Sequence, residues 1–186
     1  MSRPRRALRH GAAALVAFAL VASVAASVRA KPLWNAGLET GVCGGRSSLD
    51  FEKPGWCNAL HADLLFLRQG GKDVGLGPSL RLGTERFDDV RLDTGLSVLL
   101  PLTESFPLVL EAGPHLRNFH QPGLFASAFF GLRSFNHYGH YEMAAGLCLT
   151  AERSFSQGTP SALWITARID GSWIALPFVF VYNGLK

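Results

Sequence analysis

The sequence predicts an all-β protein, an eight-stranded antiparallel up-and-down transmembrane β-barrel. Three observations support this fold class. The N-terminal segment has the features of a cleavable export signal. Nearly all of the remaining chain alternates apolar and polar residues with a period of two. The polar face is made of glycine and of charges of both signs, with hardly any lysine.

The first thirty residues have the three parts of a secretory signal. A basic stretch with four arginines is followed by an apolar run rich in alanine, and Val28 and Ala30 place small side chains at a cleavage site. A retained membrane anchor is the alternative, but the run is short for a spanning helix and lacks large residues. We predict a signal peptide over residues 1–30 and one barrel domain over residues 31–186.

Removal of the signal changes the charge of the protein. The whole chain has a formal net charge of +4, but five of its arginines lie in residues 1–30, which leaves 13 basic and 14 acidic residues in the rest. This balance gives no reason to expect nucleic acid as a partner. The 156 residues that follow the signal fit one domain.

The cysteines are Cys43, Cys57 and Cys148, and an exported protein meets an oxidising compartment in which thiols pair. Cys43 and Cys57 flank the segment GGRSSLDFEKPGW, which has the composition of a loop. A disulfide between them would link the two strands of a hairpin where its loop begins, and it would leave Cys148 without a disulfide partner. The sequence leaves the other two pairings open.

Eight segments have the alternation of β-strands, and Gly, Pro, Asp or Asn separate them. Their lengths of 10–15 residues exceed the roughly 5–6 of a soluble sheet and suit tilted membrane strands of about 9–11 residues with overhang. The predicted strands are residues 34–43, 57–68, 74–83, 90–100, 108–117, 123–133, 141–152 and 162–176.

The connections between these strands alternate in character. Those after the even strands are compact: QGGKD, PLTESFP and SFNHYGH. Those after the odd strands are on the whole longer and more polar: GGRSSLDFEKPGW, TERFDD, NFHQPG and RSFSQGTPS. This predicts short turns at one end of the barrel and longer loops at the other. Residues 44–56 and 153–161 are the expected outward contacts, since loops carry function on such scaffolds.

Alternation alone does not say which face is outside, because a soluble barrel alternates too. Only four lysines follow residue 30, all in predicted loops or at ends. We interpret the polar face as a self-neutralising network that fills a narrow lumen, in which Gly75, Gly77, Gly83 and Gly95 leave space for long arginines. Its members are Glu39, His61, Asp63, Arg81, Arg91, Asp93, Glu111, His115, Arg117, Arg133, Glu142, Glu152, Arg168 and Asp170.

The opposite face is uniformly apolar, with leucines such as Leu76, Leu80 and Leu96. Such a surface would aggregate in water, whereas hydrocarbon requires it, together with a closed sheet that pairs every backbone group. Aromatic residues near the predicted strand ends are typical of interfacial girdles, or of core aromatics in a soluble barrel. They are Trp34, Trp56, Phe66, Phe87, Phe106, Phe119, Phe135, Tyr138, Tyr141 and Trp173.

With these features, residues 34–176 resemble the small OmpA-like outer-membrane barrels of Gram-negative bacteria. The resemblance is architectural. It implies export to the outer membrane, contact with its lipid, a barrel-assembly machinery during biogenesis and a monomer. GSWIAL, residues 171–176, is similar to the insertion signal of a last barrel strand, although Ile169 stands where a polar residue is usual. The tail over residues 177–186 extends that strand or lies at the interface.

The sequence gives little support to catalysis or metal binding. Some small outer-membrane barrels deacylate lipopolysaccharide with a His-x-Ser motif, which this chain lacks. We expect His61 with Asp63, and Glu111 with His115, to form interior hydrogen bonds. The three-residue spacing in NHYGHY suits a metal only on a helix or with further ligands.

We therefore predict no catalytic residues, metal or cofactor, and a structural, adhesion or membrane-integrity role rather than an open porin. One alternative is a soluble secreted or periplasmic barrel that binds an apolar ligand. The other is a lipid-modifying enzyme of the outer membrane.

Overall fold

The computed structural model describes residues 32–46, 54–66, 70–135, 142–156, 161–171, 173–175 and 181–182. The predicted signal peptide, both histidines of NHYGHY, Tyr138 and Tyr141, and most of the tail lie outside these residues. No helix in the described part of the chain is long and apolar enough to cross a membrane.

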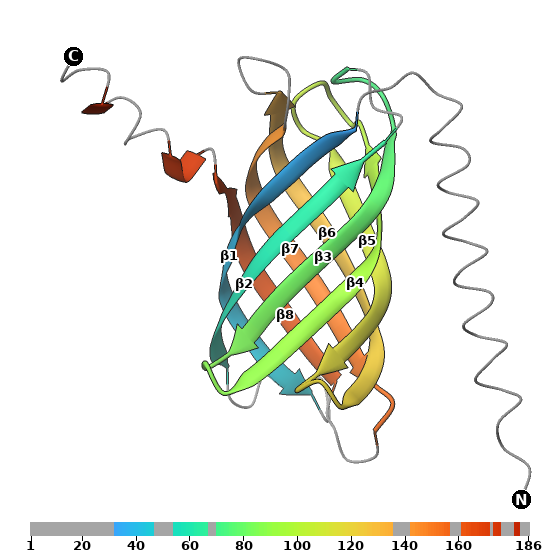
Figure 1. The fold of residues 1–186 in the computed structure, drawn as a ribbon, viewed down its shortest axis with the longest axis vertical. Coiled ribbons are helices and arrows are strands. Elements are labelled where there is room, and N and C mark those ends of the chain that lie inside the picture. Colours follow the sequence, from blue (N-terminus) through green and yellow to red (C-terminus); the bar gives the residue numbers. More distant parts are fainter. Residues whose placement is uncertain are drawn as a thin grey trace, which may run out of the picture.

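Eight antiparallel strands follow one another in chain order and close into a barrel, because β8 pairs with β1. Figure 1 shows the strands tilted against the long axis of this barrel. The strands are β1 (Leu33–Arg46), β2 (Gly55–Leu65), β3 (Gly75–Glu85), β4 (Asp89–Leu100), β5 (Leu108–Arg117), β6 (Gln121–Phe135), β7 (Glu142–Ser154) and β8 (Ser161–Asp170). The predicted fold class and strand number are confirmed.

Side-chain burial alternates along every strand, and the charged face is the inner one. Arg81, Arg91 and Asp93 are each at most 2% exposed, whereas Leu80 and Leu96 are 48% and 42% exposed. A soluble barrel has the opposite polarity, with apolar residues inside. An apolar exterior around a charged lumen is the arrangement of a transmembrane barrel.

The predicted contrast between short turns and long loops is wrong for two connections. Residues 86–88 and 118–120 are tight turns, closed by hydrogen bonds from Asp88 N to Glu85 O (3.0 Å) and from His120 N to Arg117 O (3.2 Å). Both central residues of each turn have positive φ, at Arg86 and Phe87 and at Asn118 and Phe119. This is the type I′ backbone that matches strand twist, so TERFDD and NFHQPG continue the ladders almost to their tips.

The last strand ends at Asp170, six residues before the predicted end at residue 176. Gly171 and residues 173–175 are helical, and Asp170 Oδ1 accepts a hydrogen bond from Trp173 N at 3.2 Å. Asp170 therefore acts as an N-cap, the position in which an aspartate begins a helix. Gly171 and residues 173–175 of the predicted last strand are consequently not part of it.

Residues 33–36 of β1 extend past the end of β8, since the ladder between these strands begins at Gly37 and Asp170. Beyond the end of β8, side-chain hydrogen bonds connect β1 to β7 and β8. Asn35 Nδ2 donates to Asp170 Oδ2 (2.9 Å) and to the carbonyl oxygen of Glu142 (2.7 Å) on β7. Asp170 Oδ2 also accepts from Ala144 N. These bonds join β1, β7 and β8 where the ladder stops.

The tight turns predict an unusual effect of glycine. Phe87 has a φ of 63° and is 76% exposed, so Phe87→Gly relieves a left-handed backbone and removes little packing. Relief of about 1–2 kcal/mol, less roughly 0.5–1 kcal/mol of glycine entropy, should raise the free energy of unfolding by about 0.5–1 kcal/mol. Urea unfolding of the folded barrel in detergent measures this.

Phe106 provides the matched control, because it is also exposed (46%) but does not have positive φ. Phe106→Gly should lower the free energy of unfolding by roughly 0.5–1 kcal/mol. Equal losses in the two variants would contradict the strain at Phe87.

Candidate functional site

The candidate site is the lumen, in which buried arginines and carboxylates form one connected chain of ion pairs. At the end where β7 starts, Arg133 on β6 makes a bidentate contact with Asp63, with Nη1–Oδ2 and Nη2–Oδ1 distances of 2.9 and 2.6 Å. Its Nε donates to Glu142 Oε2 at 2.5 Å. The fork of an arginine matches a carboxylate in this geometry, which makes such pairs strong.

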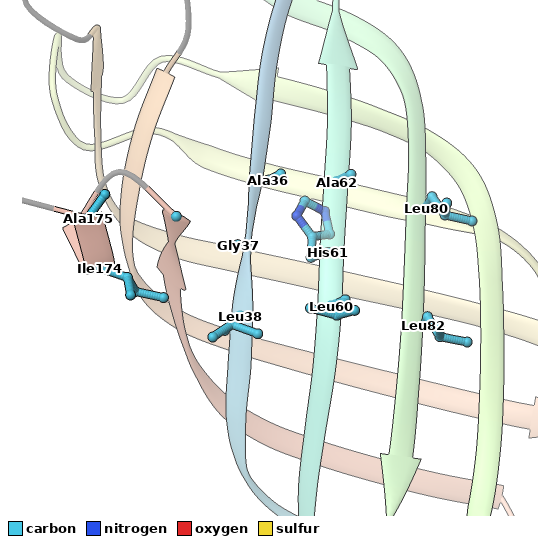
Figure 2. A pocket seen from close by; sticks show the side chains of 11 residues that line it. Ala36, Gly37, Leu38, Leu60, His61, Ala62, Leu80, Leu82, Ile174 and Ala175 are labelled. Carbon is cyan, nitrogen blue, oxygen red and sulfur yellow. The ribbon is translucent and has the colours of Figure 1, made fainter.

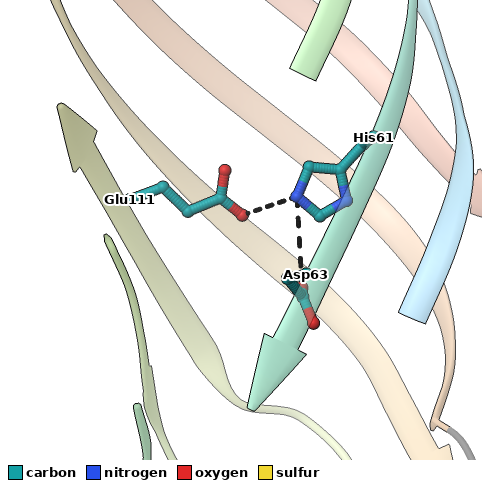
Figure 3. Close-up of side chains that lie close together, drawn as sticks. All are labelled: His61, Asp63 and Glu111. Atoms are coloured by element: carbon teal, nitrogen blue, oxygen red, sulfur yellow. Dashed lines mark hydrogen bonds and ion pairs between the residues drawn. The ribbon is translucent and has the colours of Figure 1, made fainter. Parts of the chain in front are cut away.

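His61 and Arg168 connect this cluster to the middle of the barrel. Figure 3 shows His61 Nε2 between the two carboxylates, 3.0 Å from Glu111 Oε1 and 4.0 Å from Asp63 Oδ2. Glu111 Oε1 then lies 3.2 Å from Arg168 Nη1, and Arg168 Nη2 lies 2.7 Å from Glu39 Oε1. The Arg168 guanidinium also stacks 5.0 Å from the centre of the Phe129 ring. Carboxylates thus alternate with arginine or histidine side chains through the interior.

Arg81 and Arg91 occupy the other half of the lumen. Arg81 Nε lies 2.9 Å from Asp93 Oδ2, and Arg81 Nη2 lies 2.9 Å from Glu152 Oε1. Arg91 pairs with Glu152 and with Glu85 near the barrel end. Both guanidinium groups lie 4.8 Å from the Trp164 ring centre, a distance at which a cation and an aromatic ring attract each other.

The structure places thirteen of the fourteen residues of the predicted lumen network in the buried interior: Glu39, His61, Asp63, Arg81, Arg91, Asp93, Glu111, His115, Arg133, Glu142, Glu152, Arg168 and Asp170. Arg117 is different, because its half-buried side chain pairs with Asp89 at the end of the barrel. Asn118 holds the same end together by donating to Asp89 Oδ1 at 2.7 Å and accepting from Val90 N at 2.9 Å.

The expected hydrogen bonds along single strands are replaced by bonds to other strands, across the lumen for His61 and to the paired neighbouring strand for His115. The closest carboxylate to His61 is Glu111, from β5, and His115 Nδ1 lies 2.5 Å from Asp93 Oδ1, from β4. Residues two apart on a strand are spaced by about 6–7 Å, so a side chain from another strand can approach more closely. The carboxylate closest to each histidine therefore lies on another strand, not on the histidine's own strand.

The sequence interpretation missed the aromatic and neutral part of the lumen. Trp164 is fully buried between two arginines, and Thr150 Oγ1 accepts from Arg81 Nη1 at 2.6 Å. The alternation of faces along a strand could have revealed both residues. Trp164 lies four residues before Arg168, and Thr150 lies two before Glu152, so each shares the inward face of its strand. Near the end where β2 stops, the interior also holds a layer of apolar side chains besides the Arg133 cluster, so the lumen is not polar throughout. This layer is Leu65, Leu99, Val109, Phe129, Ala144 and Cys148.

The four glycines that were expected to make room for arginines make room for other groups. A Cβ at Gly83 would lie 3.1 Å from the Trp164 ring, and a Cβ at Gly95 would lie 2.3 Å from the carbonyl oxygen of Ala112. Gly77 meets the backbone of Leu64, and Gly75 meets the side chains of Leu65 and Leu99. Neighbouring strands and bulky inward side chains, rather than guanidinium groups, take up the space.

Two clusters in the lumen have the residue types of a metal site. His61, Asp63 and Glu111 place their ligand atoms within 4.8 Å of one another, as do Asp93, His115 and Glu152. Each of the four carboxylates already contacts an arginine: Arg133, Arg168 or Arg81. A cation would have to displace those arginines, so the clusters are better described as parts of the ion-pair network.

Cys43 and Cys57 form a disulfide between β1 and β2, with their Cα atoms 5.9 Å apart. Both are fully buried and pack with Ala162 and Trp164 inside the barrel, so the bond lies within the strands rather than in the following loop. Cys148 is a free thiol on β7. Its Sγ lies 3.0 Å from Ser127 Oγ and 3.6 Å from Arg168 Nη2.

A closed eight-stranded barrel with an apolar exterior and a charged lumen defines the class of small membrane β-barrels. No protein-family profile matches the sequence, and no curated protein matches it. Among solved structures, the chain is similar to the backbone structure of the outer membrane protein Ail of Yersinia pestis in a phospholipid bilayer nanodisc. That similarity covers 73% of this chain and 98% of the other, with 12% identity and a TM-score of 0.39.

The ion-pair chain predicts a large cost for a single deletion inside the barrel. Arg133→Met removes the guanidinium that contacts both Asp63 and Glu142, and breaking a buried pair from one side costs roughly 3–5 kcal/mol. Urea unfolding should show this loss, and adding Asp63→Asn should restore part of it, since the unpaired charge is then removed.

Arg153→Met is the control, because Arg153 lies on β7 with its side chain exposed on the outside. Its free energy of unfolding should change by no more than about 0.5 kcal/mol. Similar small changes in both variants would show that the lumen pairs contribute little.

Proposed function

We propose that this protein is a small integral outer-membrane barrel with a filled lumen, whose role is structural or in surface interaction rather than in solute transport. The single observation that supports this best is the reversed polarity of the barrel. Its exterior is apolar along all eight strands, and fully buried charges of both signs occupy its interior.

The exterior supports residence in a lipid bilayer. Exposed apolar side chains include Leu60 (57%) on β2, Leu147 (65%) on β7 and Ile165 (45%) on β8. Exposed aromatics lie toward both ends of the barrel, for example Trp34 and Phe106 at one end and Trp56 and Phe119 at the other. Aromatic girdles on both sides of an apolar band are characteristic of membrane barrels.

The lumen supports a closed barrel rather than a pore. An eight-stranded barrel encloses little more than its own side chains. Here those side chains include Arg81, Arg91, Arg133 and Arg168, each at most 2% exposed and fixed by carboxylates from other strands. Passage of a solute would require several of these pairs to separate together.

The positions of the histidines argue against a lipid-modifying enzyme. His61 and His115 are 2% and 3% exposed and point into the lumen, where arginine-bound carboxylates surround them. A lipid in the bilayer would meet the outer face, which neither imidazole reaches. We expect the lipid A of cells with and without this protein to have the same acylation.

The end of the barrel at which β1 finishes is the expected contact surface. The tight turns there present Phe87 (76% exposed) and Phe119 (63% exposed), and Phe155 (62%) follows β7 at the same end. Residues 47–53 and 157–160, the central parts of the two predicted contact loops, lie outside the described residues. We further expect a monomer that the barrel-assembly machinery inserts after export.

Fractionation tests the membrane location. The protein should sediment with outer membranes and require detergent for release, because its exterior is apolar. Purified protein added to a planar bilayer should give no steady single-channel current. Recovery from the soluble periplasm without detergent would refute the location, and a reproducible open-channel current would refute the filled lumen.

A charge on the outer face tests the same proposal by stability. Leu147 is on β7 with its side chain directed outward, so Leu147→Arg should cost about 2–4 kcal/mol in the free energy of unfolding from a bilayer. Leu102→Arg is the control, because Leu102 is equally exposed (61%) but lies in the turn after β4 and should lose roughly 0–1 kcal/mol. A neutral Leu147→Arg would indicate that this face meets water.

A further inference from the structure

The outer wall has a trough across the first three strands. Ala36 on β1 pairs with Ala62 on β2, which pairs with Leu80 on β3, so two methyl groups stand where neighbouring rows carry larger side chains. On one side of the two alanines lie Leu38, Leu60 and Leu82; on the other lie Trp34, Leu64 and Pro78.

The helical turn after β8 closes the trough at its β1 end. Figure 2 shows Ile174 and Ala175 on one side of the floor that Ala36 and Ala62 form, and Leu80 on the other. This hollow has a volume of about 720 Å³, and a second hollow of about 320 Å³ adjoins it and shares Ala36, Ala62 and Leu80 with it. The turn exists because Asp170 ends β8 early and caps the following residues.

We propose that this trough is a binding site for one lipid acyl chain. The site takes a saturated or unsaturated hydrocarbon chain, because apolar side chains of leucine, isoleucine, alanine, tryptophan and proline line its sides. The proposal rests on the proposed membrane location, since the trough is continuous with the exterior that would face lipid.

Shape, rather than hydrophobicity, distinguishes this site from the rest of the wall. A bilayer is itself apolar, so a chain gains nothing by leaving it for another apolar surface. What it can gain is dispersion contact, which grows with the number of atoms within about 4 Å. On a smooth strand surface a chain touches one side, whereas in the trough it touches the alanine floor, the leucine rows and Ile174. A chain there should therefore remain longer than one elsewhere on the barrel.

Trp34 provides an optical probe, because it lines the second hollow and is 51% exposed. The reference protein carries Trp56→Phe and Trp173→Phe, and keeps Trp164 inside the lumen. Phosphatidylcholine with brominated acyl chains, which quench indole fluorescence on contact, is titrated into the full mature protein in detergent micelles. We expect quenching of Trp34 that saturates near one lipid per protein.

Filling the trough is the decisive comparison. Ala36→Phe and Ala62→Phe place a ring on its floor and should raise the lipid concentration for half-quenching by about tenfold. Ala126→Phe is the matched control, because Ala126 is an exposed outward alanine on β6, away from the trough. It should leave the titration unchanged, and heat-dependent migration on gels checks that each variant is folded.

Two results would overturn the acyl-chain site alone. Quenching that rises without saturation, equally in the filled variants, would mean that lipid touches the wall without a site. Saturable quenching that appears only after residues 176–186 are deleted would mean that the protein's own tail fills the trough. Absence of quenching even in brominated-lipid vesicles would overturn the membrane location as well, so the two failures are distinguishable.

Discussion

The lumen can hold four guanidinium groups only because each one touches at least two carboxylates. Arg81 contacts Asp93, Glu152 and Glu39, and Arg168 contacts Glu39 and Glu111. A lone buried charge is costly, so the shared carboxylates are what makes a charged interior stable. Because the pairs join residues from different strands, including β1 to β8, the same contacts also favour the closed barrel.

Much of this arrangement follows from the two-residue period of a strand. Once Arg81 and Asp93 are placed inside, the positions of Leu80 and Leu96 outside are fixed, because successive side chains point to opposite faces. The sequence therefore sufficed for the fold class, for the direction of each face and for most residues of the lumen. The same parity would have placed Trp164 beside the arginines, although the sequence interpretation assigned it to neither face.

What could not be predicted depends on contacts between distant residues. Parity places His61 in the lumen but does not say whether Asp63 on its own strand or Glu111 on β5 will be nearer. The end of β8 depends on Asp170, whose carboxylate bonds to Trp173, Asn35 and the backbone of β7. The tight turns at residues 86–88 and 118–120 carry Arg-Phe and Asn-Phe where glycine is the usual signal, so local propensity did not reveal them.

The position of the Cys43–Cys57 disulfide sets an order of events in biogenesis. The bond is fully buried behind Trp164 and Ala162, where no oxidase or thiol can reach it once the sheet has closed. It joins only neighbouring strands, so the isolated β1–β2 hairpin already contains everything the bond requires. Oxidation must therefore precede closure of the sheet, while both thiols are still accessible to solvent. Because the hairpin is the first of the barrel in chain order, its two thiols can pair before β7 brings Cys148 into the sheet.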